Sequence, residues 1–271
     1  MDRRAIGVFD SGLGGLTAVR ELRRRLPQED IVYFGDTGRV PYGTRSRETI
    51  ARYALQDTRF LVSHDVKLVV IACGTASSAV SPETMAAFPL PWTGVIRPTA
   101  EAAVRASRSG RIGILGTAAT IHSGSFQRML HTLRPEAELT AQAGTLLVPL
   151  VEAGWTDDRY PAARMVLETY LRPLRAAGVD TLILGCTHYP LLRPMIAQLM
   201  GDAVTLIDSG EATAAHTAGL LTRFGLEGDP THRGTSRFYV SDTVDRFTEI
   251  ASAFLGADIT GRVEQVDIES Y

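Results

Sequence analysis

Two stretches of this 271-residue chain decide its fold: LVVIACGT at residues 68–75 and TLILGCTH at residues 181–188. Each is a short run of Val, Ile and Leu that ends close to a cysteine and a threonine. Apolar runs of this length are typical of strands buried on both faces of a parallel sheet. Because open α/β sheets bind ligands beyond the carboxyl ends of their strands, Cys73 and Cys186 are predicted to face one ligand from opposite sides.

Other strand-like runs alternate with helix-length segments along the whole chain. The predicted strands lie at residues 5–9, 31–34, 68–72, 94–96, 111–115, 181–185, 205–207 and 237–240. Apolar residues at three-to-four spacing predict a helix over residues 16–26, and residues 244–255 are also helix-like. This alternation predicts an α/β protein with mainly parallel sheets.

An internal repeat indicates two related domains. The segment IGVFDS at residues 6–11 can be laid over IGILGT at residues 112–117, and each copy then reaches its cysteine after a similar length of chain. We therefore predict two related α/β domains. The first comprises residues 1–97 plus 211–271, and the second comprises residues 98–210.

The composition excludes several classes of partner. The chain has 28 basic and 30 acidic side chains, interspersed along the sequence, and a net charge of -2. This gives no basic stripe for nucleic acid and no cationic helix for a membrane surface, and no apolar run approaches the roughly 18 residues of a membrane span. We expect a cytoplasmic protein that binds small molecules, with both cysteines reduced.

The residue types also restrict the cofactor. Lys67 is the only lysine and it precedes a strand, away from the ligand crevice, so pyridoxal phosphate lacks a partner for its Schiff base. A zinc site needs three or four ligands, and only His188 lies near either thiol in sequence. A cysteine hydrolase could use Cys186 as its nucleophile, but the matched thiol of Cys73 would then have no role. The residues thus argue against pyridoxal phosphate and against a metal site of the zinc type.

A glycine-rich turn, DSGLGGL at residues 10–16, joins a strand to a helix. Its glycine spacing does not match G-x-G-x-x-G, and the carboxylate of Asp10 would repel a pyrophosphate. Asp10 is better suited to an ammonium group. A purely structural turn, with Asp10 or Ser11 as the helix cap, explains the segment equally well.

Three further features each have a functional and a simpler interpretation. The loop at residues 35–43 could hold a carboxylate through amides near Gly43 and the Tyr42 hydroxyl, or it could be an ordinary turn. His188 could polarise the Cys186 thiol or only bond its own loop. Glu152 could support His188, although an exposed helix acid is the simpler explanation.

The combination of these motifs resembles the glutamate racemases of the cofactor-independent aspartate/glutamate racemase family. The segments that carry the resemblance are DSGLGG (10–15), PYG (41–43), ACGTAS (72–77), PLVE (149–152) and GCTHYP (185–190). The resemblance implies two pseudo-symmetric α/β domains with substrate between them and no cofactor. It also implies a D-glutamate product destined for peptidoglycan.

Carried over by position, the resemblance assigns roles to individual residues. Cys73 and Cys186 match the two acid/base thiols, and Asp10, Glu152 and His188 match the residues that assist them. The matched substrate contacts are Asp10, Ser11, Pro41, Tyr42, Gly43, Gly74, Thr75 and Thr187. Gly74 departs from the family, which usually has asparagine there, and supplies no side-chain donor.

The expected activity is the interconversion of L- and D-glutamate by proton transfer between two cysteines. The alternatives are a racemase or decarboxylase of the same fold with a different substrate preference because of Gly74, or a catalytically impaired homologue that only binds ligand. A homodimer is the expected assembly.

Overall fold

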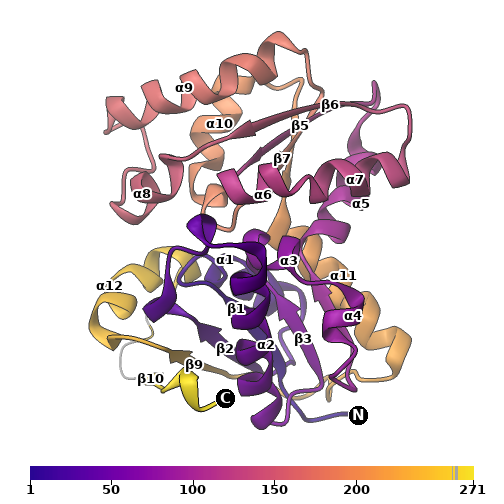
Figure 1. Cartoon of the computed structure of the whole chain (residues 1–271), viewed down its shortest axis with the longest axis vertical. Coiled ribbons are helices and arrows are strands. Elements are labelled where there is room, and N and C mark those ends of the chain that lie inside the picture. The colour runs from indigo at the N-terminus through magenta and orange to yellow at the C-terminus, as the bar shows by residue number, and fades with distance from the viewer. Residues whose placement is uncertain (258, 260–261) are drawn as a thin grey trace.

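Two parallel sheets organise the chain in the computed structural model, which describes residues 1–257, 259 and 262–271 (Figure 1). The first sheet has the strand order β10-β9-β2-β1-β3-β4 and the second has the order β6-β5-β7-β8. The first sheet contains β1 (Ile6–Asp10), β2 (Ile31–Gly35), β3 (Leu68–Ile71), β4 (Trp92–Gly94), β9 (Ser236–Val240) and β10 (Val263–Gln265). The second contains β5 (Arg111–Gly116), β6 (Glu138–Ala143), β7 (Thr181–Leu184) and β8 (Thr205–Asp208).

Helices connect the strands and cover both faces of each sheet. They are α1 (Leu16–Arg25), α2 (Arg47–Ser63), α3 (Gly74–Ala79), α4 (Pro82–Met85), α5 (Ile96–Ala106), α6 (Ala118–Ser123), α7 (Ser125–Leu133), α8 (Leu147–Glu152), α9 (Pro161–Ala176), α10 (Arg193–Met200), α11 (Ser209–Phe224) and α12 (Val244–Leu255). The helices predicted over residues 16–26 and 244–255 are confirmed as α1 and α12. Within the described part of the chain, no helix has both the length and the apolar character needed to cross a bilayer.

Alternate side chains of β1 pack into two different hydrophobic cores. Ile6 and Val8 belong to the cluster that includes residues of α1 and α12, whereas Phe9 packs into the cluster that includes residues of α2. This alternation follows from the two-residue repeat of a strand. A strand buried on both faces is continuously apolar, which explains why the runs at both cysteines could be recognised in the sequence.

The two sheets repeat the same local order, which confirms the predicted pseudo-symmetry. β1 lies between β2 and β3 with β4 beyond, and β5 lies between β6 and β7 with β8 beyond. The matched registers pair Ile6 with Leu68 and Ile112 with Thr181. As a result, the chain after β3 and the chain after β7 carry their cysteines at equivalent places. We call the parts of the molecule built on the two sheets the first half and the second half.

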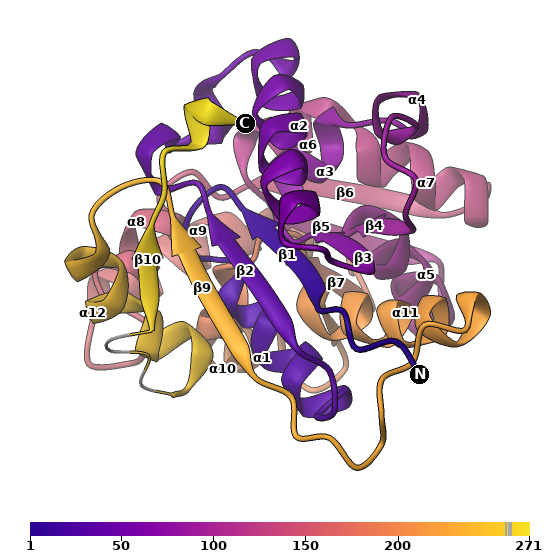
Figure 2. The ribbon, with the colours of Figure 1, turned by 90° about the horizontal axis from the view of Figure 1, so that it is seen from below.

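The chain passes between the halves through two helices. The predicted crossing points, at residues 97–98 and 210–211, fall in the first turns of α5 and α11. After α11 the chain returns to the first half, where β9 pairs with β2 and β10 with β9 (Figure 2).

The strand predicted over residues 94–96 is wrong for its last two residues. The observed strand β4 ends at Gly94, and Ile96 begins α5. The carbonyl of Val95 accepts the hydroxyl of Thr99 one helical turn later, and Pro98 fits the first turn because it needs no amide donor there. A helix start therefore follows directly on a short edge strand.

Candidate active site

A cavity of about 490 Å³ lies between the halves, at the carboxyl ends of the strands. Its walls come from the loops after β1, β2 and β3 and from those after β5, β6 and β7. All of the site residues predicted from sequence line it: Asp10, Ser11, Pro41, Tyr42, Gly43, Cys73, Gly74, Thr75, Glu152, Cys186, Thr187 and His188. Segments up to 178 residues apart in the chain are thus brought to one site.

Cys73 lies in a buried environment made of hydroxyl and amide groups. It precedes α3, donates to Ser11 Oγ at 3.5 Å and accepts the Ala76 amide at 3.4 Å. Burial and, next, the neighbouring Asp10 carboxylate raise the pKa of Cys73 to about 12. In the ligand-free site Cys73 is therefore a neutral thiol and a proton donor at neutral pH.

Cys186 lies beside an imidazole instead. Its sulfur is 3.8 Å from Nδ1 of His188, whose Nε2 is 3.1 Å from Oε1 of Glu152. Burial would lower the pKa of His188, but its hydrogen bonds with Cys186 and Glu152 raise the value to about 10. His188 is therefore protonated at neutral pH and places a positive charge beside the sulfur of Cys186.

The two cysteine-bearing turns touch through glycines. A Cβ added to Gly74 would lie 2.9 Å from the carbonyl oxygen of Gly185. Gly74 directly follows Cys73 and Gly185 directly precedes Cys186, so the main chains next to the two thiols are in contact. A side chain at position 74 would have to move this contact apart.

Asp10 presents a buried acceptor to the cavity. Its Oδ2 accepts the amide of Gly12 at 2.9 Å, whereas its buried Oδ1 has no hydrogen-bond partner among the described residues. Burial raises the pKa of Asp10. An unpaired buried acceptor costs about 1–3 kcal/mol, so a ligand that donates to Oδ1 would recover that energy. The interpretation of Asp10 or Ser11 as a helix cap is wrong, because the N-cap of α1 is Gly15 and no side chain in the described part of the chain caps this helix. Asp10 instead bonds the turn through the amide of Gly12.

The loop after β2 differs from the prediction in the direction of one hydroxyl. Tyr42 lines the cavity, but its hydroxyl donates to Asp36 at 2.5 Å and lies 3.0 Å from Asp57. Arg39 also pairs with both carboxylates. The hydroxyl of Tyr42 has no second hydrogen for a substrate carboxylate, so any donor from this loop is a main-chain amide near Gly43.

Four threonines that line the cavity were not predicted from the sequence: Thr44, Thr117, Thr120 and Thr145. Thr117 caps α6, and its hydroxyl lies 3.2 Å from that of Thr75 and 2.9 Å from that of Thr120. The internal repeat contained a signal for Thr117, because it aligns with Ser11, and Ser11 touches Cys73. The equivalent loop of each half thus supplies a hydroxyl to the cavity.

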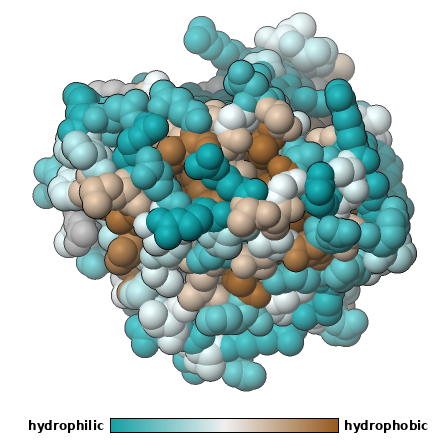
Figure 3. Space-filling view, turned by 90° about the horizontal axis from the view of Figure 1, so that it is seen from above, coloured by the Kyte–Doolittle hydropathy of each residue, from teal (hydrophilic) through white to brown (hydrophobic). Residues whose placement is uncertain are grey.

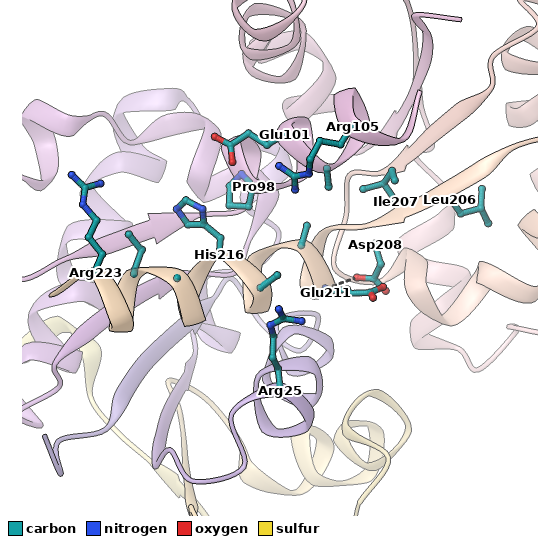
Figure 4. A pocket seen from close by; sticks show the side chains of 15 residues that line it. Arg25, Pro98, Glu101, Arg105, Leu206, Ile207, Asp208, Glu211, His216 and Arg223 are labelled. Atoms are coloured by element: carbon teal, nitrogen blue, oxygen red, sulfur yellow. Dashed lines mark hydrogen bonds between the residues drawn. The ribbon is translucent and has the colours of Figure 1, made fainter. Parts of the chain in front are cut away.

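A second cavity, of about 610 Å³, lies between α5, α11 and the end of α1 (Figure 4). Arg25, Arg105, Arg223 and His216 line it together with carboxylates such as Glu211. Neither thiol reaches it. The smaller cavity is the better candidate because it gathers the nucleophilic and acid/base groups. Across the described residues, no group of three or more His, Cys, Asp or Glu side chains is placed to hold a metal ion.

Comparisons with known proteins find racemases that are similar to this chain over its whole length. The family model described as Asp/Glu/Hydantoin racemase matches residues 16–217. A glutamate racemase of Geobacter metallireducens is 46% identical over 270 residues, covering 100% of this chain and 99% of that protein. The crystal structure of an isoform of glutamate racemase from Bacillus anthracis has a TM-score of 0.93, with 38% identity and 98% coverage of both chains. That of the Francisella tularensis glutamate racemase in complex with D-glutamate has a TM-score of 0.91, with 34% identity and full coverage of both chains.

Proposed function

Because the chain belongs to the Asp/Glu/Hydantoin racemase family, we propose that it is a glutamate racemase that interconverts L- and D-glutamate without a cofactor. The observation that carries this proposal is the placement of Cys73 and Cys186 at one small cavity, at the ends of equivalent strands in the two halves. Racemisation needs a base on one face of the α-carbon and an acid on the other, and two thiols from opposite halves meet that need.

The proposed reaction is a proton transfer through a carbanion. One cysteine acts as thiolate and takes the α-proton, and the electron pair of the broken C–H bond moves toward the α-carboxylate. The other cysteine then gives its thiol proton to the opposite face of the carbon. The imidazolium of His188 lies beside the sulfur of Cys186, and the raised pKa of Cys73 keeps that residue protonated. Cys186 is therefore assigned as the first base and Cys73 as the first acid.

The remaining site residues are proposed to bind the substrate's charged groups. The substrate ammonium is assigned to Oδ1 of Asp10, the buried acceptor without a partner. Hydroxyls and amides at Ser11, Thr75 and Thr187 are assigned to the α-carboxylate, where charge develops in the transition state. Main-chain amides of the loop from Pro41 to Gly43 are assigned to the distal carboxylate. Gly74 contributes only its main chain.

We also propose the biological setting and the assembly. The product, D-glutamate, would serve peptidoglycan synthesis in the cytoplasm, as the family resemblance implies. The active unit would be a homodimer. Three large apolar side chains that remain exposed around α8 and α9, Leu146, Trp155 and Met165, give such a dimer a surface to bury. Figure 3 shows apolar patches among the hydrophilic residues at the end of the molecule that carries the second half.

The division into domains is part of the same proposal. Residues 1–97 with 211–271 are assigned to one domain and residues 98–210 to the other. The membership of the strands in the two sheets supports this division.

Circular dichroism of amino-acid solutions tests the activity. The purified protein is given L-glutamate and D-glutamate separately, then the enantiomers of aspartate and other amino acids. Loss of the signal with glutamate, at a rate above that for every other substrate, is the expected result. Binding of glutamate without any loss of signal would instead identify a catalytically impaired homologue.

Gly74 makes an altered substrate preference the second candidate. A substrate other than glutamate that is racemised or decarboxylated faster would favour it. In that case the Gly74→Asn variant should shift the ratio of activities back toward glutamate.

A further inference from the structure

The imidazole of His188 belongs to the second half but is enclosed by the first. A Cβ added to Gly14, in the turn before α1, would lie 2.6 Å from Nδ1 and 2.7 Å from Cε1 of His188. Phe254, on α12, presents its buried ring edge-on to the imidazole, with ring centres 5.2 Å apart. Figure 1 places α12 below α8, on the same side of the molecule. Two elements of the first half therefore limit where this ring can lie.

A buried hydrogen bond joins the same two segments. Thr17, on α1, is only 1% exposed. Its hydroxyl donates to the carbonyl of Thr187 at 2.8 Å and is shared with the carbonyl of Gly14 at 2.9 Å. Thr187 lies between Cys186 and His188 in sequence. One hydroxyl thus ties the glycine turn of the first half to the main chain that carries the second thiol and its histidine.

We propose that Gly14, Thr17 and Phe254 are positioning residues that hold the His188 ring against the Cys186 thiol when the two halves are in contact. None of the three needs to touch the reacting atoms. Glu152 fixes the Nε2 end of the ring, and Gly14 lies at the Nδ1 end, which faces the sulfur. Phe254 packs against the ring, and Thr17 holds the main chain of the preceding Thr187. The proposal rests on the proposed racemase function and adds that the first half controls the second thiol.

The proposed clamp acts on one thiol only. Among the described residues, the Cys73 sulfur forms hydrogen bonds with Ser11 and Ala76, both within the first half. A change at Thr17 should therefore impair proton transfer at Cys186 and leave that at Cys73 almost intact. Racemisation cannot reveal this difference, because every turnover uses both thiols.

Elimination from a glutamate analogue with a halogen on its β-carbon separates the two thiols. One thiolate takes the α-proton, the C–H electrons form the double bond, and the halide leaves with its bonding electrons, so each enantiomer needs only the thiol that faces its proton. The Cys73→Ala and Cys186→Ala variants first establish which enantiomer depends on which thiol. Halide release is then measured for both enantiomers with the Thr17→Val variant.

For the enantiomer that depends on Cys186, the rate of halide release should fall by roughly tenfold or more, because small misplacements of catalytic groups have effects of this size. For the other enantiomer the rate should change by less than about twofold. The ratio of the two rates does not depend on how much of the preparation is folded. Thr17→Ser should restore the ratio.

Thr58→Val is the matched control. Thr58 is an equally buried threonine whose hydroxyl bonds to its own helix, at the carbonyl of Ala54, so its removal should leave the ratio unchanged. A Thr17→Val variant with an unchanged ratio, in a protein that racemises glutamate, would overturn the clamp alone. An unmodified protein that neither racemises nor eliminates would overturn the proposed function, and the clamp with it.

Discussion

The surroundings of the two cysteines differ more than the strands that carry them. β3 and β7 hold equivalent places in their sheets, and each is followed by a cysteine at the same cavity. Yet Cys73 has a serine hydroxyl, a main-chain amide and a buried carboxylate around it, whereas Cys186 has a histidine backed by a glutamate. The fold places the two thiols at equivalent positions, and the surrounding loops place different charged and polar groups beside each sulfur.

This difference suits a reaction that needs unlike groups at the start. Two thiols in identical surroundings would have the same pKa, so nothing would determine which of them starts as the base. Burial and the Asp10 carboxylate raise the pKa of Cys73, whereas the protonated imidazole of His188 places a positive charge beside Cys186. A substrate ammonium next to Asp10 would weaken the first effect and allow the roles to be exchanged.

Removal of either thiol is expected to have the largest effect on the activity. Cys73→Ala and Cys186→Ala should each lower racemisation of glutamate by at least about a thousandfold, because the acid or the base is lost. Circular dichroism with both enantiomers measures it. Substantial racemisation by either variant would show that the halves do not act as a pair.

Asp10→Asn tests the effect of the buried carboxylate beside Cys73. Loss of a charged hydrogen bond costs about 1.5–3 kcal/mol, so kcat/KM should fall between about tenfold and a hundredfold. Since the carboxylate helps to raise the pKa of Cys73, the same change should also lower that pKa from about 12. Thiolate absorbance followed against pH in the Cys186→Ala background, where one thiol remains, gives the midpoint. A midpoint that stays or rises would contradict the role of Asp10.

His188→Asn tests the surroundings of Cys186 through the pH dependence of the free energy of unfolding. The pKa of His188 is about 10 in the folded protein and 6.5 ordinarily, so the folded state binds more protons between these values. Its contribution to the free energy of unfolding is complete below pH 6.5 and is lost as the pH rises toward 10, by at most about 1.4 kcal/mol per pH unit. Urea unfolding at pH 6.5, 7.5 and 8.5 should show a steeper loss in the unmodified protein than in His188→Asn. Equal slopes would mean that the imidazolium is not stabilised in the folded state.

Gly74→Ala probes the contact between the two cysteine turns and has the smallest expected effect. Its Cβ would meet the carbonyl of Gly185 at 2.9 Å, and overpacking of this kind costs about 1–3 kcal/mol. The urea midpoint should fall accordingly. Gly219→Ala is the control, because a Cβ on Gly219 in α11 would have no neighbour within 4 Å. If both variants are equally stable, the turns are not in close contact.

The sequence predicted the centre of each sheet and twelve residues that the structure brings to one cavity. Strands buried on both faces are continuously apolar, and the repeat of Ile-Gly strands indicated the pseudo-symmetry. The sequences of the edge strands β6 and β10 predicted strands less clearly. β6 (Glu138–Ala143) is half-exposed and rich in Ala, Thr and Gln, and β10 (Val263–Gln265) has only three residues. Neither carries the apolar pattern by which the other strands were predicted.

Details that depend on tertiary contacts could not be predicted. The hydroxyl of Tyr42 points to Asp36 and Asp57 because the loop packs on α2, which no local pattern encodes. Likewise, the closeness of Gly14 and Thr17 to the chain around His188 depends on how the halves meet. The family resemblance supplied the list of site residues, and the structure supplied their partners.

Racemisation in deuterium oxide tests the central claim most directly, namely that two thiols face one α-carbon from opposite sides. Each enantiomer of glutamate is incubated separately, and the α-deuterium content of product and recovered substrate is measured early in the reaction. The account predicts deuterium in the product from either enantiomer while the recovered substrate keeps its α-proton. Deuterium appearing in the recovered substrate as fast as in the product would indicate a single base and contradict the account.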